Sequence, residues 1–328
     1  MRRRDFIALL GGAAARPVAA LAQPSDRIRQ IAIWVGRAND AEGQRVTRPF
    51  RQRLQALGWT EGRNIRTDYR WVTGDIDRLR TIAKEVVEQS PDLIVAETTA
   101  AVAALSRESR TIPIVFVNVS DPIGSGFVAS LARPGGLITG FISNEPTLGG
   151  KWPELLKEIA PGVRRVGFMF NPDTASYAGA FMRPAEVAAL SLGIELVASR
   201  VYNDTEIERA IVALGTDPGG GLIVLPESTT NARAELIIAL AARYRLPAIY
   251  AYRFQVTGGG LISYGVDLAD SFGTAASYAD RILRGEKPAD LPVQAPIKLT
   301  LVVNLKTATT LGLTIPRSIL LRADEVIE

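Results

Sequence analysis

The sequence predicts an α/β protein made of two similar lobes, each built around a parallel sheet. From residue 29 onward, short apolar runs alternate with longer amphipathic ones. Strands separated by helices of this length form parallel sheets with right-handed crossovers. The alternation pauses at a loop-rich stretch, 118–136, and then restarts. The chain has 328 residues, which is more than one typical core accommodates. We therefore expect two lobes with a break near residues 138–145.

The first half of the chain contains five predicted strands. Residues 30–35 are predicted to be a strand, because 31–35 are continuously apolar, as is typical of a strand buried on both faces. Apolar side chains then recur at helical spacing from Val46 to Leu57, and the helix ends at Gly58. Residues 65–71 alternate in polarity, as a strand with one wetter face does. The series continues with a helix at 75–89, a strand at 93–96, a helix at 99–110, and strands at 112–117 and 137–142.

The second half repeats the pattern with longer helical segments. Its predicted helices span 148–160, 175–192, 205–214, 231–244, 268–284 and 305–311. Its predicted strands span 163–170, 194–200, 221–225, 248–250, 261–264 and 299–303. We assign 28–141 to the first lobe and 142–267 to the second. Part of the C-terminal segment, about 268–328, is expected to return to the first lobe.

The N-terminus carries an export signal. Residues 3–7 form a twin-arginine pattern, an apolar stretch follows at 7–15, and Ala20-Leu21-Ala22 supplies the small residues that a signal peptidase reads. A membrane anchor or a first helix of the mature protein is the alternative. The apolar run is shorter than the roughly 20 residues that span a bilayer, and Pro17 interrupts it. We therefore expect residues 1–22 to be a twin-arginine-type signal peptide, cleaved after Ala22, and the protein to be periplasmic.

Composition excludes several classes of function. The leader accounts for +3 of the formal charge of +4, because four arginines oppose one aspartate there, so the rest carries +1 and gives no reason to expect nucleic-acid binding. The chain has neither cysteine nor histidine. Disulfides, thiol catalysis, Ser-His-Asp triads and imidazole metal sites are therefore excluded. An enzyme would have to use carboxylates, lysine, tyrosine or a borrowed cofactor.

Polar and aromatic side chains follow many of the predicted strands, at the loops where open α/β sheets bind ligands. Hydroxyls and helix N-termini suit a carboxylate. Carboxylates suit an ammonium group, and aromatic rings suit a planar body. A zwitterionic amino acid would satisfy all three. Ser, Thr, Asp and Asn are also the preferred helix N-caps, so only their convergence favours a binding site. The residues are Glu97, Thr98, Thr99, Asn118, Ser120, Asp121, Asn171, Asp173, Ser176, Tyr177, Glu227, Ser228, Thr229, Tyr252, Tyr264 and Asp267.

Motifs for other chemistry are missing. The glycine-rich stretches lack the spacing of a dinucleotide or phosphate loop and are interpreted as turns. Asp75 and Asp77 lack the remaining ligands of a calcium loop. No nucleophile elbow is present. We expect no cofactor, no metal and no catalytic residue.

Several segments carry a family resemblance. They are FRQRLQALGWTEGRN at 50–64, the strand at 92–96 with the threonines after it, IPIVFVNVSDPIGSG at 112–126, LARPGGLITG at 131–140 and VGFMFNP at 166–172. The run from SDPIGSG through ARPGGLITG is the most specific. Over nearly all of the chain after the leader, the sequence resembles the substrate-binding component of an ATP-binding-cassette (ABC) transporter, in a group described as an uncharacterised transport system.

The resemblance implies a type I periplasmic-binding fold, with two Rossmann-like lobes, a three-stranded hinge and a ligand in the cleft. Some relatives are associated with aromatic amino acids. Carried over by position, the preferred cleft residues are Thr98, Thr99, Asp121, Glu227, Ser228 and Tyr252. Relatives often carry Asp-Asn where this chain has Glu227-Ser228, so the identity of the ligand does not transfer with the fold.

The leading hypothesis is capture of a small solute by hinge closure, followed by delivery to a membrane permease and its ATPase. Asp121 or Glu227 would bind a ligand ammonium, and Tyr252 would stack on the ligand. Thr98, Thr99 and Ser228 would bind its carboxylate. Two alternatives stay open, a periplasmic sensor module and a carboxylate-based two-domain enzyme. A monomer is expected.

Overall fold

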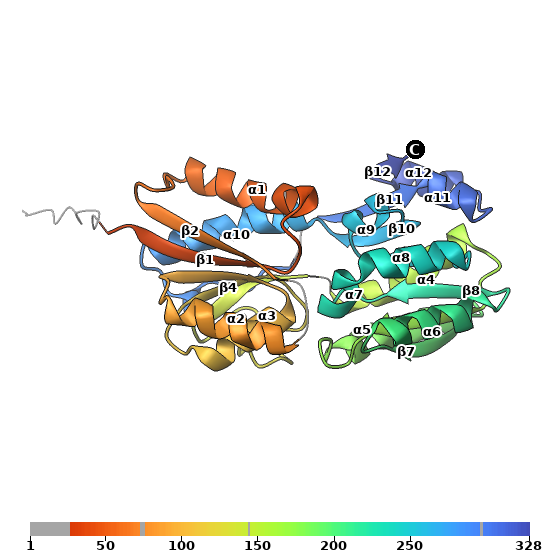
Figure 1. The fold of residues 1–328 in the computed structure, drawn as a ribbon, viewed down its shortest axis with the longest axis horizontal. Coiled ribbons are helices and arrows are strands. Elements are labelled where there is room, and N and C mark those ends of the chain that lie inside the picture. Colours follow the sequence, from red (N-terminus) through yellow and green to blue (C-terminus); the bar gives the residue numbers. More distant parts are fainter. Residues whose placement is uncertain (1–26, 73–75, 144, 296–297) are drawn as a thin grey trace, which may run out of the picture.

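The computed structural model describes residues 27–72, 76–143, 145–295 and 298–328. The predicted signal peptide, residues 1–22, lies outside the described residues. The chain forms two lobes that lie side by side (Figure 1). Within the described ranges, every helix is too short or too polar to span a membrane.

The first lobe is built on a five-stranded parallel sheet with the order β2-β1-β3-β4-β5. The three inner strands are buried along almost their whole length, as expected where helices cover both faces of a sheet. Edge strand β2 is mostly half-buried, which explains its alternating sequence. The strands are β1 (Arg29–Val35), β2 (Ile65–Trp71), β3 (Leu93–Glu97), β4 (Ile114–Val119) and β5 (Ile138–Ile142).

Four helices cover the first sheet. In β1, Ile31 and Ile33 join one apolar cluster with α1 (Ala41–Ala56) and α10 (Leu268–Leu283), whereas Ala32 and Trp34 join another with α2 (Ile76–Glu88) and α3 (Thr99–Glu108). Successive side chains of one strand thus reach opposite helix layers, as the period of two requires.

Helix α10 comes late in the sequence, but it packs on the first lobe. It lies against α1 and beside β3, β4 and β5. At its far end, Trp59 donates its indole N–H to Asp280 over 2.8 Å. The chain therefore passes between the lobes three times. It crosses after β5, between β10 and α10, and again between α10 and β11.

The second lobe is built on a seven-stranded, mainly parallel sheet with the order β12-β11-β10-β9-β8-β6-β7. Strand β11 runs antiparallel to β10 because the chain re-enters this lobe after crossing to α10. The strands are β6 (Arg165–Phe170), β7 (Glu195–Arg200), β8 (Gly220–Val224), β9 (Ala248–Tyr250), β10 (Ile262–Val266), β11 (Leu299–Asn304) and β12 (Glu325–Ile327).

Helices again lie on both faces of this sheet. Trp152 and Phe181 stack with ring centres 5.9 Å apart beneath one face. Ile211 and Ile237 belong to the core on the other face. The helices are α4 (Lys151–Ile159), α5 (Ala178–Ser191), α6 (Asp204–Gly215), α7 (Ser228–Ala232), α8 (Ala234–Arg243), α9 (Arg253–Thr257), α11 (Leu305–Thr310) and α12 (Arg317–Arg322), with short 3-10 turns η1 (Pro146–Gly150) and η2 (Pro288–Asp290).

The C-terminal segment divides between the lobes. Its first part, α10, packs on the first lobe. Its later part does not, because β11 and β12 hydrogen-bond into the second sheet. The helix predicted at 231–244 is also two helices, α7 and α8, which meet at Arg233.

Phe272 tests whether α10 is a structural part of the first lobe. Its side chain is completely buried in the core that α10 shares with α1. We expect Phe272→Ala to lower the free energy of unfolding by about 3–5 kcal/mol, because it removes a fully buried ring and leaves a cavity. Urea unfolding measures this. The control Leu190→Ala removes a side chain that is 82% exposed and should change little; equal effects of the two substitutions would refute the packing described.

Candidate ligand site between the lobes

The carboxyl ends of strands from both sheets meet between the lobes. A hydrogen bond joins them directly, because the Tyr252 hydroxyl after β9 donates to Asn118 Oδ1 at the end of β4 over 2.8 Å. Both residues are buried. Burial is the main cause that raises the pKa of the Tyr252 phenol, so this hydroxyl stays a neutral donor at physiological pH. This hydrogen bond holds the ends of β4 and β9 against each other between the lobes.

A buried ion pair occupies the first-lobe side of the site. Glu97, the last residue of β3, is fully buried and binds the guanidinium of Arg37 through Nη2 at 2.5 Å. The backbone N–H of Gly36 donates to the same carboxylate over 3.0 Å. Burial opposes the charge of Arg37, but the Glu97 carboxylate outweighs it, and the pKa of Arg37 is raised.

Thr98 and Thr99 are held by backbone hydrogen bonds. The Thr98 hydroxyl caps α3 by accepting from the N–H of Ala101. The Thr99 hydroxyl accepts from the N–H of Ser120 over 3.1 Å and donates to its carbonyl. Ser120 then exchanges a 2.7 Å hydrogen bond with Ser143. These contacts tie the ends of β3, β4 and β5 together, so both threonines have the capping and bracing roles that such residues often have.

Glu227 is the central charged group on the second-lobe side. Its carboxylate caps α7, accepting from the backbone N–H groups of Thr229 at 2.6 Å and Thr230 at 2.7 Å, and it also accepts from the Thr174 hydroxyl. The side chain is only 3% exposed. Burial outweighs these hydrogen bonds and raises the pKa of Glu227. Among the described residues, no lysine or arginine forms an ion pair with it.

Tyr177 lies near Glu227 and Tyr252. Its hydroxyl donates to the Pro226 carbonyl over 2.8 Å. Burial raises the pKa of the Tyr177 phenol well above its ordinary value, and the nearby Glu227 carboxylate and Tyr252 add to the effect. The Tyr177 phenol is therefore close enough to interact electrostatically with both of them.

A cavity of about 320 Å³ opens beside this site, between the loop after β1 and helices α7, α8 and α9. Its wall includes Arg37 and Phe254, which also belong to the interlobe site, and the apolar side chain of Ile238. The side-chain amide oxygen of Asn231, Oδ1, is buried at this cavity and has no hydrogen-bond partner in the described structure. The volume is in the range of pockets that hold small molecules.

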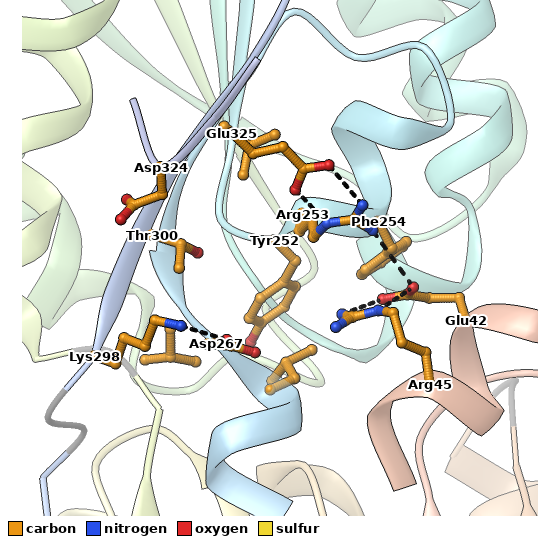
Figure 2. Close-up of a pocket in the computed structure, with 13 residues that line it drawn as sticks. Glu42, Arg45, Tyr252, Arg253, Phe254, Asp267, Lys298, Thr300, Asp324 and Glu325 are labelled. Carbon is orange, nitrogen blue, oxygen red and sulfur yellow. Dashed lines mark hydrogen bonds and ion pairs between the residues drawn. The ribbon is translucent and has the colours of Figure 1, made fainter. Parts of the chain in front are cut away.

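A second pocket, of about 200 Å³, lies where the chain crosses between the lobes (Figure 2). Charged side chains line it and pair with one another. Arg253 lies between Glu325 and Glu42, Arg45 also binds Glu42, and Lys298 binds Asp267. Because their charges are paired within the protein, this pocket is a charged joint between the lobes.

The six residues predicted for the cleft differ in their placement. Glu227 and Tyr252 lie buried in the interlobe site, whereas Thr98 and Thr99 are bound to backbone. Asp121 is half-buried and accepts from the Gly124 N–H over 2.8 Å, and Ser228 is half-buried at the start of α7.

Arg37 is a site residue that the six predicted residues omit. It is the second residue after β1, so the search for polar residues after strands that found the others would have included it.

The sequence pattern of the family described as "ABC transporter substrate binding protein" matches residues 31–327. The chain is 26% identical over 270 residues to a tyrosine-binding protein of Clostridioides difficile, covering 80% of this chain and 75% of that protein. The match spans nearly all of the described fold.

Two solved structures resemble the fold. A conserved domain protein from Vibrio cholerae has a TM-score of 0.83 at 30% identity, over 92% of this chain and all of that one. A Streptococcus pneumoniae domain crystallised with L-Trp has the same TM-score at 24% identity, over 92% of this chain and all of that one. The expectation of two α/β lobes with mainly parallel sheets, the type I periplasmic-binding fold, is confirmed.

Replacing Glu97 tests the buried ion pair. We expect Glu97→Gln to lower the free energy of unfolding by about 3–5 kcal/mol, because it leaves the Arg37 charge in a nearly closed site without a counter-ion. Urea unfolding of the ligand-free protein measures the loss, and adding Arg37→Gln should restore much of it. The exposed pair Lys151–Glu154 provides the control, since Glu154→Gln should cost less than about 1 kcal/mol. A loss at Glu97 as small as this would contradict the role given to the pair.

Proposed function

Since the chain belongs to the ABC transporter substrate-binding proteins, we propose that it captures an amino acid between its lobes and delivers it to a membrane permease. Proteins of this family bind solutes outside the cytoplasm and are not enzymes. The expected recognition as such a protein is therefore confirmed, and the enzyme alternative is set aside. The ligand class, the bound state and the delivery partner form the proposal.

Glu227 is the observation that carries the amino-acid assignment. A carboxylate that is 3% exposed and has no cationic partner in the described structure needs a positive charge to offset its desolvation. A ligand ammonium supplies that charge and three N–H donors. A neutral sugar would leave the charge uncompensated. Glu227 therefore favours an amine-bearing solute.

The rest of the ligand has suitable surroundings. The cavity wall combines the Phe254 ring, an apolar side chain from α8 and the Arg37 guanidinium. An aromatic or aliphatic body packs on such a wall, and a carboxylate is attracted by the arginine. The similar Clostridioides difficile protein is described as tyrosine-binding, which supports an amino acid with a large side chain.

Export belongs to the same proposal. A twin-arginine leader with cleavage after Ala22 would place the protein in the periplasm, folded before it crosses the inner membrane. We propose a monomer there, with the permease and its ATPase as partners.

A thermal-shift screen tests the ligand class. The protein is unfolded and refolded to remove carried-over solute, then mixed with L-tyrosine, L-tryptophan, tyramine, D-glucose or D-galactose. Ligand at about a thousand times its Kd stabilises by roughly 4 kcal/mol, which shifts Tm by several degrees. We expect a shift with an amino acid and none with the sugars. A shift with the sugars alone would refute the proposal.

Glu227→Gln tests the ammonium contact. We expect it to weaken binding of the amino acid found in the screen by at least about tenfold, roughly 1.4 kcal/mol, because Gln keeps the shape without the charge. Isothermal titration measures the Kd. Asp121→Ala is the alternative arm, since Asp121 is the other candidate anchor. If that variant loses affinity while Glu227→Gln does not, the ammonium binds on the first-lobe side.

The pH dependence of binding follows from the raised pKa of Glu227. The free carboxyl takes up a proton at a higher pH than usual, whereas a bound ammonium favours the ionised form. Affinity should therefore be constant near neutral pH and fall as the pH decreases through this raised pKa. Titrations from about pH 7.5 down to about pH 5 measure this, and the decrease should be absent in Glu227→Gln. A wild-type affinity that rises with acidification would contradict the assignment.

A further inference from the structure

Three consecutive residues of the second lobe each contact a different element of the first lobe. Tyr252, Arg253 and Phe254 follow β9 and begin α9. Helix α9 packs on β10, β11 and α8, so this segment is anchored within the second lobe. All three side chains border the joint between the lobes (Figure 2).

Tyr252 makes the buried contact of the three. Its hydroxyl donates to Asn118 Oδ1 across the gap, and the tyrosine is only 2% exposed. Asn118 has a positive φ of 59°, a conformation that asparagine tolerates better than most residues. When the lobes separate, this hydrogen bond breaks.

Arg253 makes an ionic contact. Its Nη1 lies 3.9 Å from Glu42 Oε2 in α1 of the first lobe. On its other edge, two hydrogen bonds of 2.5 and 2.7 Å hold it to Glu325 in β12 of its own lobe. The C-terminal strand therefore orients the guanidinium toward the first lobe (Figure 2).

Phe254 makes the third contact. The Arg37 guanidinium lies over its ring, 5.3 Å from the centre. Tyr252 and Phe254 also stack with their ring centres 6.0 Å apart. The Tyr252–Asn118 hydrogen bond and the Phe254–Arg37 cation–π contact are therefore made by two rings that stack on each other.

We propose that residues 252–254 form a closure clasp, which sets the affinity for every ligand by stabilising the closed arrangement of the lobes. This inference rests on the proposed capture by closure. The Tyr252 and Arg253 contacts join protein to protein, and both side chains lie outside the cavity wall proposed to hold the ligand, to which Phe254 also belongs. These two contacts therefore favour the closed form equally whichever solute is bound. Removing one should therefore weaken all ligands by the same factor. A side chain that touches the ligand would instead change the preference among ligands.

Tyr252→Phe is the main test. It keeps the ring and leaves the buried Asn118 oxygen without its donor, which costs about 1–3 kcal/mol or roughly 5- to 150-fold in affinity. We expect the Kd values of L-tyrosine and L-tryptophan, or of whichever two amino acids the screen yields, to rise by the same factor. The matched control is Tyr250→Phe. Tyr250 is also buried, but its side chain belongs to the core of the second lobe, so this substitution should leave both affinities unchanged.

Arg253→Gln tests the ionic contact separately. A partly exposed pair such as Arg253–Glu42 contributes about two- to fivefold, and salt screens it. The loss should again be equal for both ligands and should shrink at about 1 M NaCl. Arg233→Gln is the control, because Arg233 has the same 32% side-chain exposure and its ion pair with Asp204 lies within the second lobe.

Interlobe distance separates failure of the clasp from failure of the proposed function. Because the chain has no cysteine, spin labels at Glu108→Cys and Glu208→Cys report one distance between α3 and α6. Tyr252→Phe should shift its distribution toward the open form. A loss for one ligand only, or unchanged affinities and distances, would overturn the clasp. If the wild type binds neither amino acid, the proposal of amino-acid capture fails. The distribution of interlobe distances in the ligand-free protein then tests the clasp by itself. A shift in the variant supports the clasp, and no shift overturns it.

Discussion

Both sheets end their parallel strands at the same gap, and this placement governs what the remaining residues can do. The inner strands are mainly apolar and buried on both faces. The polar groups of the site are therefore at the carboxyl ends of the strands, either near the end of a strand, as Glu97 in β3 and Asn118 in β4, or in the loops beyond. The chain crosses between the lobes at three points, with α10 fixed to the first lobe and β11 to the second. Any relative motion of the lobes therefore changes the distance between the polar loops of the two sheets.

The two halves of the site are built differently. On the first-lobe side, Thr98, Asn118 and Asp121 all have positive φ angles, of 83°, 59° and 46°. Such conformations cost of order 1–3 kcal/mol each in non-glycine residues and persist where the surroundings impose them. The hydrogen bonds between Thr99, Ser120 and Ser143 supply that constraint. On the second-lobe side the backbone is ordinary, and the demanding feature is the buried charge of Glu227. The first lobe thus contributes a rigid surface to the site. The second lobe contributes a buried carboxylate whose charge needs a positive partner.

Periodicity in the sequence was sufficient to predict the fold but only the neighbourhood of the site. The strands of both cores were recognisable because helices on both faces leave them continuously apolar, as in β3 and β4. Strand β12 and the short helices α9 and α12 were not; each has only three to six residues in which a period could show, although the equally short β9 and α11 were predicted. The strand β11 was predicted, but its antiparallel direction could not be foreseen, since the direction depends on where α10 packs.

Site residues were harder to predict because caps and ligand contacts use the same residue types. Thr98 and Thr99 follow a strand like Glu227 does, yet their hydroxyls bind backbone. Tyr252 was expected to stack on a ligand, which stays a prediction, but the hydrogen bond of its hydroxyl to Asn118, 134 residues away in sequence, was not foreseen. No local pattern records such a pairing. Arg37 was within reach of the strand-end rule, and its partner Glu97 was already among the polar residues noted there.

Glu227 shows how stability and selectivity oppose each other at this site. A buried carboxylate costs the ligand-free protein free energy, which the three donors around it only partly recover, since its pKa stays raised. An amine-bearing solute would relieve that cost on binding, whereas a neutral solute of the same size would increase it by removing the remaining water. The same desolvation that disfavours the empty closed form would therefore discriminate between ligands. The Tyr252 and Arg253 contacts of the clasp have the complementary effect, because they stabilise closure without contacting the ligand. Affinity and selectivity are then set by different residues, and each can change with little effect on the other.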